Sequence, residues 1–296
     1  MSIPILAVWV ALFTVASTSL HHDKRIINGK EAEPFSRPYM VFLLSCKKYP
    51  PERGDCQQCG GVVLDKNWVL TAAHCVEDKK TGVNYPGDKI NLFFGVHNFS
   101  TNEAKTKRHA QHVIKHHKWN GKMDSDIALI RMDTPVELGD RVQAATLSQE
   151  NSDFVYETCL LAGWGDTEQG EPSGLREVNI TYIPDELCAH IWKENFKELE
   201  QEDVDIDDVR GWIEKKTCAF DISPGRQGQG SACEGDSGGP MLCGEDQNIV
   251  VGISSFVTSK PKTCGWLSVY TRVSKYLTWM EAIRGYVDSL YEGVKY

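Results

Sequence analysis

Ser237, His74 and Asp126 are the residues of this sequence best suited to carry chemistry. Ser237 lies in the segment GDSGGP, His74 in TAAHC, and Asp126 opens the apolar segment DIALI. A serine hydroxyl is a poor nucleophile alone, because it needs a neighbouring base and donors for the oxyanion of its tetrahedral intermediate. The surrounding glycines permit a tight turn that aims the N–H groups of Gly235 and Ser237 at one spot. Each segment alone has an ordinary structural reading, but together they indicate nucleophilic catalysis.

The elements that must hold these residues are predicted to be short strands. After residue 25, eight segments rich in β-branched and aromatic residues are separated by Gly, Pro, Asn and Asp. These segments are 38–44, 60–64, 90–94, 127–132, 158–162, 175–183, 249–256 and 267–273. Regular short strands without long helices predict an all-β sandwich or barrel.

Two helices and two charged runs complete the pattern. Helices are predicted over about 185–200 and 275–291, and the second has an apolar stripe that is expected to pack on the core. The stripe consists of Leu277, Met280, Ile283, Val287 and Leu290. The acidic run 194–208 is expected to be a solvated insertion. The basic, His-rich run 105–118 is expected to be a solvated strand edge rather than a heparin or metal site.

The net charge, the apolar N-terminal run and the number of cysteines favour an extracellular protein with disulfides. The net charge of -9 over 296 residues argues against a nucleic-acid partner. An apolar run at 3–16 with small residues after it predicts a signal peptide over 1–19, and it is too short to span a membrane. Ten Cys are an even number, which in a secreted chain predicts a set of disulfides.

Seven segments of the chain resemble the trypsin/chymotrypsin family of serine peptidases. They are IINGKEA, CGGVVL, WVLTAAHC, DIALIRM, AGWG, GDSGGP and VYTRVSKYLTWM, spread over nearly all of residues 26–280. The resemblance implies the chymotrypsin fold: two packed six-stranded antiparallel β-barrels, with the active site between them, and a C-terminal helix. The peptidase domain would then cover residues 26–296. The order of His, Asp and Ser excludes an α/β-hydrolase, in which the serine comes first.

The resemblance also assigns roles to the candidate residues. Ser237 would attack the scissile carbonyl, His74 would take and return the proton, and Asp126 would orient the imidazole. The amides of Gly235 and Ser237 would form the oxyanion hole. Ser255 would hydrogen-bond near Asp126 and offer its carbonyl to the substrate. A non-catalytic binding module of the same fold is the rival reading, but such homologues usually lose a member of the triad.

Activation by cleavage is implied at the other end of the chain. IINGKEA matches the mature amino terminus of the family and follows Arg25 directly. A cut after Arg25 would remove a propeptide of residues 20–25 and free the Ile26 amine. That ammonium would bury itself against Asp236, because a buried charge needs a partner. The activator must therefore be a protease that cuts after Arg.

The cysteines fit the same resemblance. It implies the pairs Cys59–Cys75, Cys159–Cys243, Cys188–Cys218 and Cys233–Cys264. Cys46 and Cys56 are left, and they can close a short loop that is not typical of the family. All ten are used, so no free thiol is expected.

The pocket for the side chain before the cut bond departs from the trypsin-like pattern. Ser231 stands where trypsin-like members carry Asp, which disfavours cleavage after Arg or Lys. Val257 and Ser268 stand at wall positions that are usually Gly, and Phe256 replaces the usual Trp. An elastase-like preference for Ala, Val or Leu is predicted, and a chymotrypsin-like preference for Leu, Phe and Tyr is the alternative. Asp221 lies in an insertion; it could reach the pocket, but exposure to solvent is expected.

The sequence also bears on metal binding, glycosylation and partners. Val96 replaces the first acidic ligand of the family's calcium loop, so neither a metal nor a cofactor is expected. Asn98 and Asn179 begin glycosylation sequons, whose use the sequence leaves open. The expected protein is a secreted monomer that acts on proteins or peptides and meets serine protease inhibitors. No membrane partner is expected.

Overall fold

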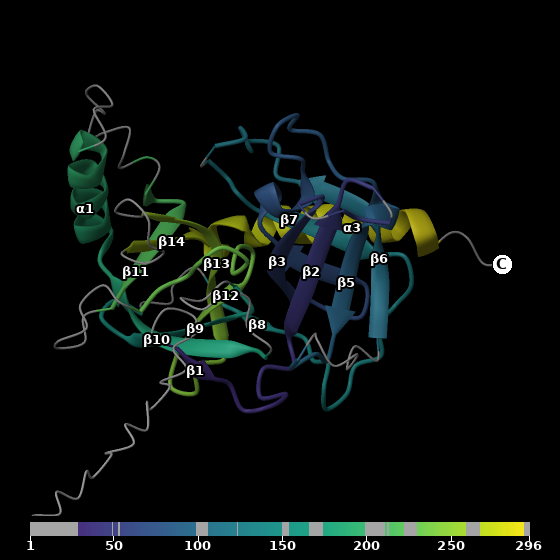
Figure 1. The fold of residues 1–296 in the computed structure, drawn as a ribbon, viewed down its shortest axis with the longest axis horizontal. Coiled ribbons are helices and arrows are strands. Elements are labelled where there is room, and N and C mark those ends of the chain that lie inside the picture. Colours follow the sequence, from purple (N-terminus) through teal and green to yellow (C-terminus); the bar gives the residue numbers. More distant parts are fainter. Residues whose placement is uncertain are drawn as a thin grey trace, which may run out of the picture.

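A computed structural model shows two β-barrels side by side (Figure 1). The residues that it describes are 29–48, 50–52, 54–98, 106–122, 124–149, 154–165, 174–198, 211, 213–221, 230–258 and 267–292. The predicted signal peptide, the propeptide and the Arg25–Ile26 bond lie outside these residues, and so does the greater part of the acidic run 194–208. None of the helices in the described ranges is long and apolar enough to cross a membrane.

The first barrel is closed by six antiparallel strands in the order β2-β3-β4-β7-β6-β5. They are β2 (Met40–Cys46), β3 (Cys56–Val63), β4 (Trp68–Thr71), β5 (Ile90–Phe94), β6 (Thr106–Lys115) and β7 (Ala128–Met132). Large apolar side chains such as Leu43, Trp68 and Leu129 are fully buried in it. The expectation of a strand edge for the basic run is wrong, because β6 pairs with β5 on one side and β7 on the other.

The second barrel repeats the six-stranded plan. Its strands are β9 (Thr158–Gly163), β10 (Arg176–Ile183), β11 (Lys216–Phe220), β12 (Pro240–Cys243), β13 (Ile249–Thr258) and β14 (Leu267–Arg272). They follow one another as β10-β11-β14-β13-β12-β9, and the pairing of β9 with β10 closes the ring. Two short strands are added outside it, β1 (Lys30–Glu31) on β10 and β8 (Thr146–Leu147) on β13. The predicted chymotrypsin fold is confirmed.

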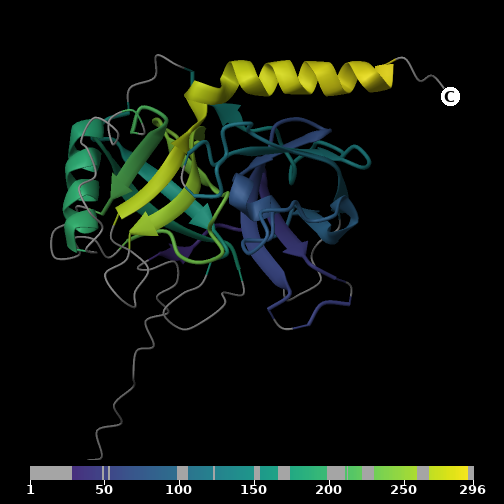
Figure 2. The same cartoon turned by 90° about the horizontal axis from the view of Figure 1, so that it is seen from above.

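In the described part of the chain, α-helices α1 (Asp185–Glu198) and α3 (Leu277–Glu292) lie on the outside of the barrels (Figure 2). A 3₁₀ turn, η4 (Val273–Tyr276), leads into α3, which runs along the first barrel (Figure 2). The indole N–H of Trp68 donates to Asp288 of this helix at 3.0 Å. The apolar stripe is buried at Met280 and Val287, but Leu290 is 54% exposed. That part of the prediction is wrong, because the last turn of α3 reaches the outer margin of the barrel (Figure 2).

Disulfides join the strands at several points. The pairs are Cys46–Cys56, Cys59–Cys75, Cys159–Cys243 and Cys188–Cys218, all of them predicted pairs. Cys46 and Cys56 are register partners at the ends of β2 and β3, so their bond closes the hairpin loop. Cys233 is also disulfide-bonded, and its predicted partner Cys264 lies outside the described residues. A disulfide-rich chain of this kind indicates the secretory pathway.

Candidate active site

The register of β4 and β7 brings His74 and Asp126 together. His74 lies in the 3₁₀ turn η1 (Ala73–Val76) after β4, and Asp126 precedes β7; Thr71 pairs with Ala128 in the barrel. The Nδ1 atom of His74 lies 2.7 Å from Oδ2 of Asp126. The backbone N–H of His74 donates to Oδ1 of the same carboxylate at 3.0 Å. The two contacts fix the orientation of the ring, as a general base requires.

Asp126 is buried but remains ionised. Only 1% of the residue is exposed, and Ser255 Oγ donates to its Oδ2 at 2.6 Å. The hydroxyl of Thr271 donates to its backbone carbonyl at 2.8 Å. Burial alone would raise the pKa of the carboxyl, but His74, Lys216 and Ser255 outweigh burial and lower it to about 2. A permanent negative charge therefore faces the imidazole.

Ser237 is held at the interface of the two barrels. Its backbone carbonyl accepts a 2.7 Å hydrogen bond from Gly60 of β3. Gly238 has a φ of 76°, and a Cβ there would lie 2.3 Å from Oγ1 of Thr71. Only glycine permits this approach of the loop to the first barrel. Among the described residues, the amides of Gly235 and Ser237 donate no hydrogen bond, so both remain open to a ligand oxygen.

Ser237 and His74 line one pocket. No hydrogen bond joins Ser237 Oγ to His74 Nε2 in the described chain, and Nε2 lies 3.8 Å from Cys75 Sγ. Contacts between a nucleophile and its base are often long before substrate binds and tighten in the complex. Cys75 is bonded to Cys59, so these sulfurs and His74 offer no thiolate set for a metal.

Asp236 is fully buried beside Ser237. Its Oδ1 accepts from the N–H of Gly165 at 2.8 Å and its Oδ2 from the N–H of Cys233 at 2.9 Å. A Cβ at Gly163 would lie 2.2 Å from Oδ1 of Asp236, and one at Gly165 would lie 2.5 Å from Cγ. The glycines thus make room for this carboxylate, which is no solvated turn residue. Its predicted partner, Ile26, lies outside the described residues.

A pocket of about 420 Å³ beside Ser237 is bounded by Phe256 and Val257. The Phe256 ring stands edge-on to Trp192 of α1, 4.9 Å away, so the helix supports this wall. Ser231 and Ser268 are each 1% exposed and do not line the pocket. The structure thus brings Phe256 and Val257 to the nucleophile and leaves the two serines beneath the surface.

The expected exposure of Asp221 is wrong. The residue is 4% exposed, and its Oδ2 accepts from the N–H of Gly230 at 3.0 Å. Gly230 directly precedes Ser231, so a buried carboxylate lies behind the predicted pocket floor. The cause is its position at the end of β11, where the chain is still part of the barrel wall.

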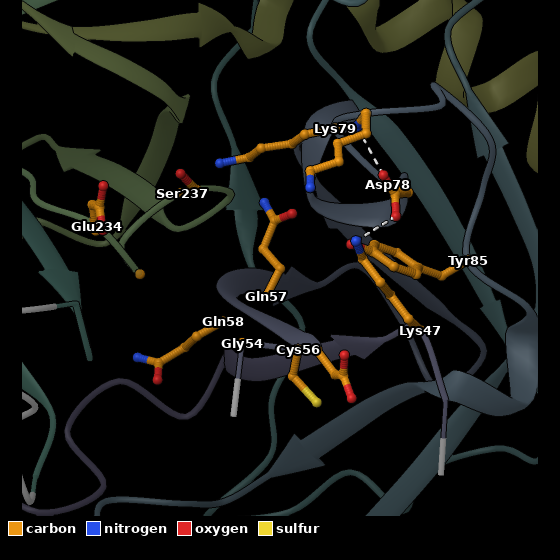
Figure 3. Close-up of a pocket in the computed structure, with 13 residues that line it drawn as sticks. Lys47, Gly54, Cys56, Gln57, Gln58, Asp78, Lys79, Tyr85, Glu234 and Ser237 are labelled. Atoms are coloured by element: carbon orange, nitrogen blue, oxygen red, sulfur yellow. Dashed lines mark hydrogen bonds and ion pairs between the residues drawn. The ribbon is translucent and has the colours of Figure 1, made fainter. Parts of the chain in front are cut away.

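A second pocket, of about 410 Å³, is also lined by Ser237. Figure 3 shows Ser237 and Glu234 on one side and Lys47 and Asp78 on the other, with Gln57 between them. Lys47 Nζ pairs with Asp78 at 2.8 Å. The sequence analysis missed this pocket, although its consecutive lysines, Lys79 and Lys80, follow the His74 segment closely.

Several remaining predictions concern the surface. Asn179 is exposed on β10, and its Oδ1 accepts from Gln247 at 3.4 Å. Asn98 is half-buried and forms a bridge with Gly174, while the rest of its sequon lies outside the described residues. Val96 is buried rather than available to a cation. The use of either sequon stays a prediction.

Comparison with known proteins gives the same family along nearly the whole chain. The model of the Trypsin family matches residues 26–280. Rat (Rattus norvegicus) granzyme M is 30% identical over 285 residues, which cover 93% of this chain and 95% of the relative. Mouse (Mus musculus) kallikrein-1 is 30% identical over 281 residues, which cover 87% and 89%. The chain belongs to the trypsin family of serine endopeptidases.

Proposed function

We propose that this endopeptidase works through Ser237, His74 and Asp126. The Ser237 oxygen attacks the carbonyl carbon of a peptide bond while His74 Nε2 takes its proton. The imidazolium gives that proton to the leaving amine, which leaves an acyl-enzyme. Water then attacks the ester, with His74 again as base, and releases the acid. Membership of a protease family implies protein or peptide substrates.

The observation that carries this mechanism is the 2.7 Å contact of His74 Nδ1 with buried Asp126. It keeps the proton of the neutral ring on Nδ1, so that Nε2 is the basic nitrogen. The oxyanion would lie between the amides of Gly235 and Ser237, which donate to no other described residue. Two unpaired donors at one point suit a developing negative charge.

The chain is proposed to be a secreted zymogen cut after Arg25. The new ammonium of Ile26 would join Asp236, whose carboxylate is already enclosed next to Ser237. A charge pair at this depth orders the loop that carries both oxyanion donors. The disulfides support secretion, since they persist in oxidising compartments.

The preferred residue before the cut bond is proposed to be small or medium and apolar. Val257 lines the pocket beside Ser237, and a β-branched side chain at that wall restricts its depth. Ser231 supplies no charge for Arg or Lys. A preference for Leu, Phe and Tyr is the alternative, and buried Asp221 behind the floor is the one feature that would favour a basic residue.

The leaving-group side is proposed to prefer acidic residues. Strand β13, with Ser255 to Val257, borders the pocket on the acyl side, so the pocket shown in Figure 3 receives the residues after the cut bond. Lys79 lines both pockets, and neither Lys79 nor Lys80 has an ion-pair partner in the described chain. These two exposed cations outnumber the one exposed carboxylate among the described residues that line both pockets, Glu234, so they are expected to attract Asp or Glu in the substrate.

A substrate panel tests the proposed preference for the residue before the cut bond. The secreted protein is cut briefly with trypsin, trypsin is removed, and peptides with Ala, Val, Leu, Phe or Arg before the bond are compared, with Ser237→Ala as control. Ala, Val or Leu should be cut fastest. Val257→Gly should raise the ratio of Phe to Val cleavage by roughly tenfold or more, since even one methylene in a hydrophobic pocket is worth about 1–3 kcal/mol. Arg as the best residue would contradict the proposal.

A further inference from the structure

Lys216, the first residue of β11, is a fully buried lysine behind the catalytic carboxylate. No part of the residue is exposed. Lysine is almost never buried this completely without partners. Its Nζ donates to Ser255 Oγ at 3.1 Å and to Thr271 Oγ1 at 3.0 Å, and it lies 5.9 Å from the centre of the Phe256 ring. The described mechanism makes no use of this ammonium.

Both hydroxyls that Lys216 contacts are directed at Asp126. Ser255 donates to Oδ2 of the carboxylate at 2.6 Å, and Thr271 donates to the backbone carbonyl at 2.8 Å. A hydroxyl has one hydrogen to donate. Because each gives its hydrogen to Asp126, each meets Lys216 through its lone pairs. The ammonium therefore fixes the direction in which both hydroxyls point.

We propose that Lys216 is a positioning residue of the triad: its buried positive charge holds Ser255 and Thr271 on Asp126 and offsets part of the negative charge that Asp126 presents to His74. The inference rests on the proposed function of the triad. A cation on the far side of Asp126 offsets part of the attraction between the carboxylate and an imidazolium. Removal of Lys216 would therefore shift the acidic limb of the pH profile of kcat/KM to higher pH.

The charges around Lys216 are compatible with this role. Burial lowers the pKa of Lys216 to about 8, while Asp126 and Asp124 act in the opposite direction and Lys215 adds to the lowering. The ammonium is thus the main form at neutral pH. Asp124 is paired with Lys215 at 3.3 Å. Tyr276 from η4 donates its hydroxyl to Ser125 at 3.2 Å, and burial raises the pKa of this phenol to about 12, so it carries no charge here.

The test is the pH dependence of kcat/KM for Lys216→Met and Lys216→Gln in the activated full chain. Lys215→Met is the matched control, because it removes the adjacent positive charge from a side chain that pairs with Asp124. The acidic limb of the pH profile of kcat/KM should move to higher pH by about 0.5 pH units or more in both Lys216 variants. It should stay within about 0.2 units of the wild type in Lys215→Met. Gln, which can still donate a hydrogen bond, should recover part of the plateau kcat that Met loses.

The inference would be overturned if, in both Lys216 variants, the acidic limb of the pH profile of kcat/KM coincides with that of the wild type. The Gln variant retains a polar group at the site, so it remains informative if the Met variant does not fold. The wild type and Ser237→Ala are run in parallel. Equal activity of the wild type and Ser237→Ala would contradict the triad itself. If the wild type is active but the pH profiles of the Lys216 variants do not shift, only the role of Lys216 is contradicted.

Discussion

Ser255 Oγ donates a 2.6 Å hydrogen bond to Oδ2 of Asp126. Ser255 belongs to β13 of the second barrel, and Asp126 precedes β7 of the first. The contact therefore crosses the interface that also carries Ser237. The alignment of the triad depends on how the two barrels pack, and not on one barrel alone.

Removing this hydroxyl should weaken catalysis without unfolding the protein. Ser255→Ala takes a donor away from a buried carboxylate, and hydrogen bonds to charged groups are worth about 1.5–3 kcal/mol. We expect kcat/KM to fall by about tenfold or more. The matched control is Ser148→Ala, a buried serine whose hydroxyl donates to the carbonyl of Gln149. Equal kcat/KM values in the two variants would contradict a role for the cross-barrel bond.

The buried charge of Lys216 should also appear in the pH dependence of stability. Burial lowers the pKa of Lys216 to about 8 in the folded chain, against 10.5 for an ordinary lysine. Between these values the unfolded chain binds more protons, so the free energy of unfolding rises with pH in this window. At low pH, where Lys216 is protonated in both states, this pKa difference lowers the free energy of unfolding by about 3 kcal/mol.

Lys216→Met should therefore stabilise the protein most below pH 8, and its advantage should shrink as the pH approaches 10.5. Urea unfolding at pH 7, 8, 9 and 10 measures the difference from the wild type, with Lys215→Met as the reference. A difference that is constant across this range would show that the folded protein does not perturb Lys216.

Gly165→Ala should disturb the carboxylate of Asp236. The new Cβ would lie 2.5 Å from Cγ of Asp236, whose two oxygens both accept backbone hydrogen bonds. Overpacking of this kind lowers the free energy of unfolding by about 1–3 kcal/mol. We expect loss of stability together with a large loss of kcat. Gly285→Ala is the control, because nothing lies within 4 Å of its Cβ and alanine favours the α3 helix. Full activity of Gly165→Ala after cleavage at Arg25 would oppose the proposed role of Asp236.

Charge reversal at Lys79 should change the preference on the leaving-group side. Lys79→Glu is expected to lower the kcat/KM ratio of substrates with Asp to those with Lys after the bond by about fivefold, the scale of an exposed pair. The change should shrink at 1 M salt, where the screening length is about 3 Å. Lys66→Glu, an exposed charge in the β3–β4 turn, should leave the ratio unaltered. An unaltered ratio in Lys79→Glu would remove the basis for an acidic preference.

The strands were predictable where local composition determines structure. The segment 90–94 is strand β5 at the same bounds, and 249–256 lies within β13. Strand β12 was not predicted, because its short segment begins with Pro240 and directly follows the turn of Ser237. Short strands gain their stability from neighbours that are distant in the sequence, and the sequence pattern does not contain that information.

The gathering of Ser237, His74 and Asp126 around one pocket was predictable because three matched segments constrain one another, whereas the surroundings were not. A lysine predicts a surface position, so Lys216 gave no signal of its burial against Ser255 and Thr271. Asp221 and Leu290 were misplaced for the related reason that burial depends on the course of the chain around them. In each case tertiary packing placed the side chain in an environment opposite to the one that its residue type predicts.

The central claim is tested most directly by fluorophosphonate labelling of the full chain before and after cleavage at Arg25. The probe reacts only with an activated serine. We predict labelling of one residue, Ser237, after the cut, little labelling before it, and none in Ser237→Ala. Absence of labelling in the cleaved wild type, or labelling that persists in Ser237→Ala, would contradict the account.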